Sequence, residues 1–220
     1  MKNISNKKRD GGFTIIETMI SVSLFIIITT VGMGALLNAH LVYKKSQDMR
    51  SIIDSLNFVM EDISRNVRTG YNYHCFTGSD SIPTSTDITL SVPKSCANGW
   101  AIAFEYAYGD NTANDTPPNP VDPIDYDDQW VYRIGGSGVN EAGKIFKATN
   151  GPYATSSFVQ LTPDEVYVDP TASFFVVEGA ENTDTAQPIV TIKLVGTITY
   201  KDVVSPFTLQ TKMSQRLLDL

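Results

Sequence analysis

Histidine, tryptophan and cysteine are scarce in this chain, with two of each among 220 residues. The cysteines are Cys75 and Cys96, and the histidines, His40 and His74, are far apart in the sequence. Zinc sites held through sulfur bring four cysteine and histidine ligands together at characteristic short spacings. Two cysteines and two distant histidines make a poor set of zinc ligands. No serine or cysteine motif surrounds either histidine. The sequence therefore contains no catalytic constellation and predicts a protein that is not an enzyme.

Formal charge is missing from residues 13–42, with Glu17 as the single exception. A helix rises about 1.5 Å per residue, and roughly 20 apolar residues cross a bilayer, so this run can cross and continue beyond. A carboxylate in a membrane segment costs on the order of 2.5–3.5 kcal/mol, and such a residue usually serves a function. Glu17 needs a cationic partner, and the run itself offers none.

A short basic leader, residues 1–12, precedes the apolar run and ends in two glycines, Gly11 and Gly12. It carries four basic residues against one acid, a balance of +3 in a chain of net charge −7, so the remainder carries −10. The positive-inside rule places the leader in the cytoplasm and the acidic remainder outside. An acidic domain argues against nucleic-acid binding, which needs a basic surface.

A secretory signal peptide and a plain signal anchor are the alternatives for this segment. A signal peptide has a shorter apolar core followed by a small-residue cleavage site, and no clear A-x-A site closes this run. A signal anchor explains the apolar run. It explains neither the glycine pair nor the presence of Glu17, a carboxylate that is costly to place in a membrane segment. Cleavage after Gly12 would instead give Phe13 a positive α-amino group. That amine could contact Glu17 of the same helix or of a neighbouring copy.

The segment Gly12-Phe13-Thr14-Ile15-Ile16-Glu17 resembles the processing site of type IV pilins and type II secretion pseudopilins. The resemblance implies that a prepilin peptidase cuts between Gly12 and Phe13 and methylates the new amino terminus at Phe13. It also implies that Glu17 supports assembly with other pilins or pseudopilins into a helical filament, on an assembly platform in the inner membrane. The close match covers about the first quarter of the chain. Residues 207–220 loosely resemble the terminal strand of minor pilins and of the pseudopilin called J.

Residues 43–68 predict an amphipathic continuation of the same helix. Apolar residues recur there at helical spacing, namely Met49, Ile52, Ile53, Leu56, Val59, Met60, Ile63 and Val67. Charged residues fill much of the other surface, and Thr69-Gly70 is a plausible stop. We expect one helix of about 80 Å that spans the membrane over residues 13–42 and packs its second half on a sheet.

Residues 69–220 predict an extracytoplasmic, β-rich, pilin-like domain. The expected strands are residues 88–92, 100–108, 129–134, 144–149, 158–161, 172–178, 189–200 and 207–216. The last three strands predict an antiparallel meander, and residues 109–128, rich in Asp, Asn and Pro, predict a long exposed loop. The fold class is therefore α+β, with a long N-terminal helix packed on an antiparallel β-sheet domain.

Two sets of side chains in this domain are candidates for covalent or metal chemistry. Cys75 and Cys96 form a disulfide by default in an exported domain, and two free, buried thiols are the alternative. Four aspartates of the long loop could offer oxygens to calcium, as in some pseudopilins: Asp122, Asp125, Asp127 and Asp128. The Asp-x-Asp-x-Asp-Gly spacing of an EF-hand is absent, so a solvated acidic loop without a cofactor is the favoured interpretation.

Two function classes remain open. In the first, the chain is a minor pilin or pseudopilin: a structural, initiating or tip subunit of a type IV pilus or type II secretion-like filament. It would wait in the cytoplasmic membrane, with its N-terminus in the cytoplasm, before assembly into an extracellular or periplasmic filament. In the second, the domain is a membrane- or filament-displayed binding module, such as an adhesin or a DNA-uptake component. The acidic charge disfavours DNA as its ligand.

Overall fold

A computed structural model describes residues 12–78, 80–82, 92–106, 129–135, 143–149, 157–181, 187–201 and 203–216. The chain divides into two compact units, residues 1–48 and residues 49–220. The first unit contains the N-terminal part of helix α1 (Ile15–Thr69), and the second contains the rest of α1 and every described strand. A long N-terminal helix followed by antiparallel sheets confirms the predicted α+β class.

Helix α1 is uninterrupted over 55 residues, and both of its ends lie within two residues of the predicted positions. At its start, the backbone N–H of Glu17 donates to Thr14 Oγ1 at 3.4 Å, so Thr14 acts as the N-cap. At its end, the Tyr73 hydroxyl donates to the carbonyls of Val67 and Gly70, at 2.7 and 2.6 Å. A Cβ at Gly70 would lie 2.3 Å from the ring of Phe104, so only glycine fits at this stop.

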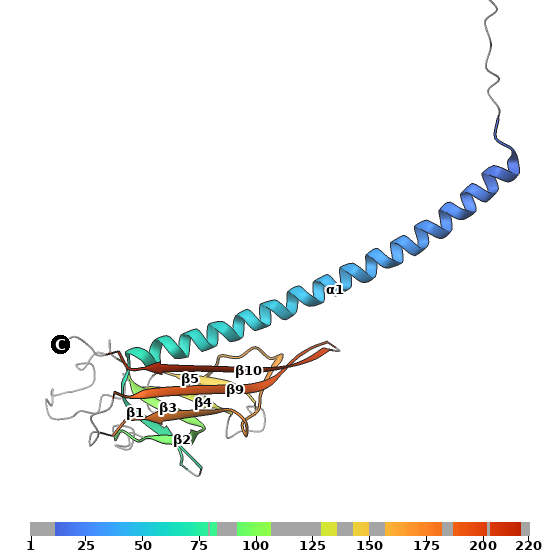
Figure 1. The fold of residues 1–220 in the computed structure, drawn as a ribbon. Coiled ribbons are helices and arrows are strands. Elements are labelled where there is room, and N and C mark those ends of the chain that lie inside the picture. Colours follow the sequence, from blue (N-terminus) through green and yellow to red (C-terminus); the bar gives the residue numbers. More distant parts are fainter. Residues whose placement is uncertain are drawn as a thin grey trace, which may run out of the picture. The chain divides into compact units, whose positions relative to one another are not determined.

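The strands of the second unit form two five-stranded antiparallel sheets (Figure 1). Sheet A has the order β1 (Tyr71–Phe76), β3 (Ala101–Glu105), β4 (Gln129–Ile134), β5 (Ile145–Ala148) and β6 (Val159–Gln160). Sheet B has the order β10 (Val203–Ser214), β9 (Ile189–Tyr200), β8 (Phe174–Glu178) and β2 (Cys96–Gly99), and β7 (Val166–Val168) also pairs with β9. The predicted meander is confirmed as β8, β9 and β10.

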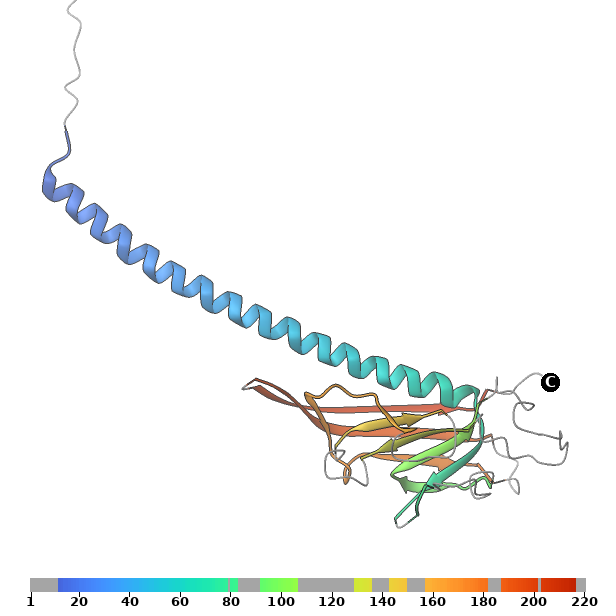
Figure 2. The ribbon, with the colours of Figure 1, turned by 180° about the vertical axis from the view of Figure 1, so that it is seen from behind.

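The core of the second unit lies between α1 and the inner faces of both sheets. The helix buries five residues of the predicted stripe: Ile52, Leu56, Val59, Ile63 and Val67. Strand β9 buries every second residue from Val190 to Ile198, as its alternation predicts. Figures 1 and 2, drawn from opposite sides, show the last turns of α1 beside β10. There the N–H of Arg216 donates to the carbonyl of Arg68 at 2.7 Å.

Several strands differ from the sequence-based expectation. Residues 69–99 contain β1 and β2 where the sequence predicts one strand at residues 88–92, and residues 83–91 lie outside the described part of the chain. Asn72 has a φ of 53° and the register shifts beside it, which hides the alternation of β1. Strand β10 begins at Val203 rather than residue 207, because an edge strand tolerates Pro206.

A polar network joins α1 to sheet A at the border of the core. The carboxylate of Asp62 accepts the Tyr132 hydroxyl at 2.8 Å and Lys147 Nζ at 3.1 and 3.3 Å. Asn66 Nδ2 donates to Asp62 and to the Tyr132 hydroxyl oxygen, at 2.9 and 3.0 Å. The Lys147 ammonium also lies 4.2 Å from the centre of the Trp130 ring. Burial, and then the charge of Asp62, raise the pKa of Tyr132, so its hydroxyl stays a donor.

Asp62→Ala will lower the free energy of unfolding by about 2 kcal/mol, because it leaves the Lys147 ammonium and the buried Tyr132 hydroxyl without their acceptor. The control is Asp54→Ala on the exposed face of the same helix, where a change within about 0.5 kcal/mol is expected. Denaturant unfolding of the full chain in detergent measures both. Equal losses in the two variants would contradict a role for the network.

Candidate functional site

The apolar part of α1 lies in the first unit, where no other described residue covers its side chains. Every residue from Phe13 to Lys44 is exposed, including Ile16, Phe25 and Ile28 with 67–69% of their surface accessible. Among the described residues, α1 is the one helix long and apolar enough to cross a membrane. Exposed apolar surface on this scale needs lipid or other helices around it.

Hydroxyl side chains within this run hydrogen-bond inside the helix. Those that donate to a backbone carbonyl three or four residues earlier, at 2.7–3.0 Å, are Thr18, Ser21, Ser23, Thr29 and Thr30. Their polarity is therefore satisfied without any partner outside the helix. In the described part of the run, the Glu17 carboxylate is the remaining charged group that must find its partner elsewhere.

Gly12 and Phe13 lie just ahead of the helix in exposed, non-helical backbone. A Cβ at Gly12 would meet nothing within 4 Å, so this chain itself does not require glycine there. Any requirement must come from a partner that approaches the backbone closely. Phe13 is 80% exposed, and Glu17 lies in the first turn, where the helix dipole favours a carboxylate. The structure thus places Gly12, Phe13 and Glu17 together around the helix start.

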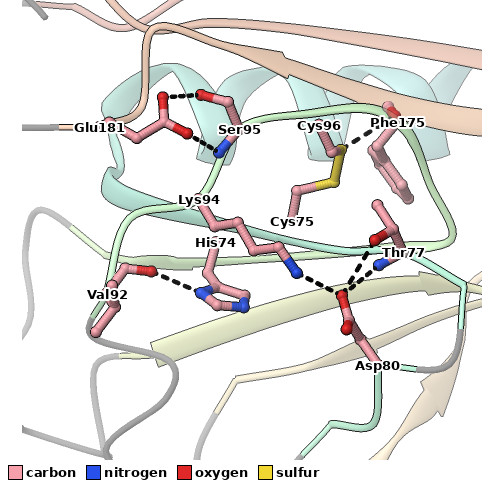
Figure 3. Close-up of polar contacts among 10 residues, drawn as sticks. All are labelled: His74, Cys75, Thr77, Asp80, Val92, Lys94, Ser95, Cys96, Phe175 and Glu181. Atoms are coloured by element: carbon pink, nitrogen blue, oxygen red, sulfur yellow. Dashed lines mark hydrogen bonds and ion pairs between the residues drawn. A yellow bond between two sulfur atoms is a disulfide. The ribbon is translucent and has the colours of Figure 1, made fainter.

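Cys75 and Cys96 form a disulfide with their Cα atoms 5.9 Å apart, which confirms the predicted pairing and excludes two free thiols (Figure 3). The bond joins β1 of sheet A to β2 of sheet B. A Cβ at Gly99 would lie 2.2 Å from Cys75 Sγ, so glycine leaves the room that the bond needs. Closing a loop with a sequence separation of 21 contributes about 3 kcal/mol in the chain-entropy model.

Backbone hydrogen bonds beside the disulfide connect β1 to the residues just before β2. Cys75 N–H donates to the carbonyl of Lys94 at 3.1 Å, and Lys94 N–H donates to the carbonyl of Tyr73 at 2.9 Å. The ring Nδ1 of His74 lies 2.6 Å from the carbonyl of Val92 (Figure 3). Burial lowers the pKa of His74, so the ring favours its neutral form here. The disulfide therefore joins the two sheets, and polar contacts hold the residues leading into β2 against β1.

Two carboxylates secure the chain on either side of this link (Figure 3). Glu181, which follows β8, accepts the N–H and the hydroxyl of Ser95 at 2.9 and 2.5 Å. Asp80 accepts Lys94 Nζ at 2.6 Å and the N–H of Thr77 at 2.8 Å. Sequence reasoning missed both contacts, and Glu181 lies 86 residues from its partner, a separation at which no local pattern signals a contact.

The hydrogen bond from Lys94, followed by that from Thr77, lowers the pKa of Asp80 to about 2. Since the folded pKa lies below the ordinary value, the stabilisation is present above about pH 4 and is lost as the pH falls toward 2. Lys94→Met will raise the pKa of Asp80, and NMR titration of its carboxyl carbon measures the change. Lys193→Met, remote from this contact, is the control. An unchanged pKa in Lys94→Met would contradict the assigned cause.

Metal binding has no support among the described residues, where no group of three or more His, Cys, Asp and Glu side chains is placed to hold an ion. The calcium candidates Asp122, Asp125, Asp127 and Asp128 lie outside that part of the chain. Calcium there stays an untested alternative to the favoured solvated loop, and an unchanged melting temperature on adding calcium or EDTA would contradict it.

Comparison of this chain with protein-family models, with curated proteins and with solved structures found no match. The class of protein is therefore defined by its fold and its site. It is a disulfide-bonded α+β domain whose N-terminal helix begins with an exposed apolar part long enough to cross a membrane.

Proposed function

We propose that the chain is a pilin-like subunit, a minor pilin or pseudopilin, cut after Gly12 and assembled through α1 into a filament. One observation carries the proposal: a long, exposed, apolar helix begins directly after an accessible Gly12–Phe13 bond and holds one carboxylate, Glu17, in its first turn. A plain membrane anchor needs neither the glycine nor the carboxylate. A subunit that exchanges lipid for neighbouring helices has a use for both.

Assembly requires a cation for Glu17, and cleavage supplies it. Cutting the Gly12–Phe13 bond creates one α-amino group on each copy, about one helical turn before Glu17, the one carboxylate of its apolar run. The amine of one copy then pairs with Glu17 of the next. Because donor and acceptor lie at different places on the same chain, this contact is heterologous and repeats along a filament.

The N-terminal mass of the protein isolated from its native membrane tests the proposal. We expect a chain that starts at Phe13, with or without one added methyl group. An intact Met1 terminus in a host with an active prepilin peptidase would contradict the proposal and leave a signal-anchored domain.

Gly12→Val will block this cleavage in the same host, because the peptidase must approach the backbone closely while the chain itself tolerates a side chain there. Gly11→Val is the matched control and should be processed. Accumulation of processed Gly12→Val protein would show that glycine is not what the peptidase recognises.

A displayed binding module is the second candidate, favoured by the compactness of residues 49–220 as a unit of their own. Deletion of the gene separates the two functions. Loss of filaments indicates a structural subunit, whereas loss of adhesion or DNA uptake with filaments intact indicates a binding module.

A further inference from the structure

We infer that Tyr43, Lys44 and Lys45 bind phosphate headgroups in the outward-facing leaflet of the membrane and so fix the depth of α1 before assembly. This inference rests on the membrane-anchored state in the proposed function. It concerns residues of the first unit, at the outer end of the apolar run.

The spacing of charges along α1 matches the thickness of a bilayer. Glu17 and Lys44 are the first charged residues met at the two ends of a charge-free stretch, 27 residues apart on one uninterrupted helix. At about 1.5 Å per residue they are separated by roughly 40 Å, close to the thickness of a bilayer with its headgroups. With Lys44 at the outer headgroups, Glu17 reaches the inner ones, where its charge is hydrated until the helix leaves the membrane for a filament.

The outer end of this stretch has the chemistry of a headgroup contact. Tyr43 is 61% exposed, and its hydroxyl oxygen accepts Gln47 Nε2 at 2.8 Å. Tyrosine is enriched at membrane interfaces, where its ring lies among acyl chains and its hydroxyl among polar groups. Lys44 and Lys45 follow directly, about 100° apart around the helix, so their side chains can reach phosphates on two sides.

Neither lysine is neutralised within the described chain. The ion pairs found there involve Lys94, Lys147 and Lys212, and none involves Lys44 or Lys45. Asp48, one turn further on, is the closest acid in sequence and makes no ion pair with either lysine in the described structure. Two unpaired cations at headgroup level favour anionic lipid, by about fivefold for each lysine.

The lipid preference of the full chain in vesicles tests this contact. Spin-labelled phosphatidylglycerol and phosphatidylcholine, each as a trace in phosphatidylcholine vesicles, report the relative association of the two lipids with the protein. We expect the preference for phosphatidylglycerol, measured above the background of the leader, to fall at least about fivefold in Lys44→Gln/Lys45→Gln. Lys44→Arg/Lys45→Arg should retain it. The leader contributes the same background in every variant.

Lys193→Gln/Lys201→Gln, in the second unit, is the matched control with the same change of charge and should keep the full preference. An unchanged preference in the Lys44→Gln/Lys45→Gln variant would overturn the headgroup contact and leave the filament proposal intact. Failure of the wild-type chain to float with the vesicles would overturn the membrane-anchored state itself, and the proposed function with it.

Discussion

Glu17→Ala will leave the chain folded and cleavable but will reduce its incorporation into filaments at least about tenfold. The side chain is exposed at the first turn of α1, and the helix start is capped by Thr14, so the fold does not depend on this carboxylate. In a filament, the Phe13 amine of a neighbour would face an apolar surrounding without its counter-charge. The fraction of processed subunit recovered in sheared filaments measures the effect.

Two further variants show which property of Glu17 matters. Glu17→Gln keeps the size and removes the charge, and we expect it to fail as alanine does. Ser21→Ala, one turn further on, removes a hydroxyl that bonds only to the carbonyl of Glu17, and it should assemble normally. Normal incorporation of Glu17→Ala, with its terminus confirmed at Phe13, would sink the proposed amine–carboxylate contact.

Gly196→Ala will destabilise the domain by about 3 kcal/mol, because the new methyl group cannot fit between two strands. A Cβ at Gly196 would lie 2.0 Å from the carbonyl oxygen of Tyr167 and 3.0 Å from the ring of Phe207. Strand β7 would have to move away from β9, with which it pairs through Val168 and Gly196. For a chain of this size the melting temperature should fall by roughly 6–12 °C, measured by circular dichroism in detergent.

Thr199→Ala is the control for this substitution. It changes an exposed residue three positions further along the same strand and should shift the melting temperature only slightly. A Gly196→Ala protein as stable as Thr199→Ala would mean that β7 is not held against β9 in solution.

The sequence predicts those helices and strands in which apolar residues recur with a clear period, and it misses those that are too short or interrupted. The stripe from Ile52 to Val67 and the alternation of β9 are strong patterns within one element, so α1 and the meander are found. Strands β2 and β7 have four and three residues, too few for a pattern, and Asn72 interrupts β1. In the sequence, Gly196 looks like one more member of the apolar face of β9, and only the pairing of β7 with β9 shows why a glycine is needed there.

The contacts of the candidate site also divide into those that the sequence predicts and those that it does not. Gly12, Phe13 and Glu17 are close neighbours along the chain, and so they form a motif that the sequence alone displays. The pairing of Cys75 with Cys96 is predictable because the sequence has only these two cysteines. The contact between Asp62 and Lys147 joins residues 85 positions apart, and such a pair is set by how the helix packs on the sheet rather than by local sequence.

The hydrogen bonds at the end of α1 have a mechanical consequence. The carbonyl of Arg68 accepts Arg216 beyond β10, while that of Val67 accepts Tyr73 of β1. A pulling force along the helix would therefore load both sheets at once. The twelve-residue pairing of β9 with β10, together with the disulfide, would share that load instead of letting a single strand peel away. Such a domain is suited to bearing tension.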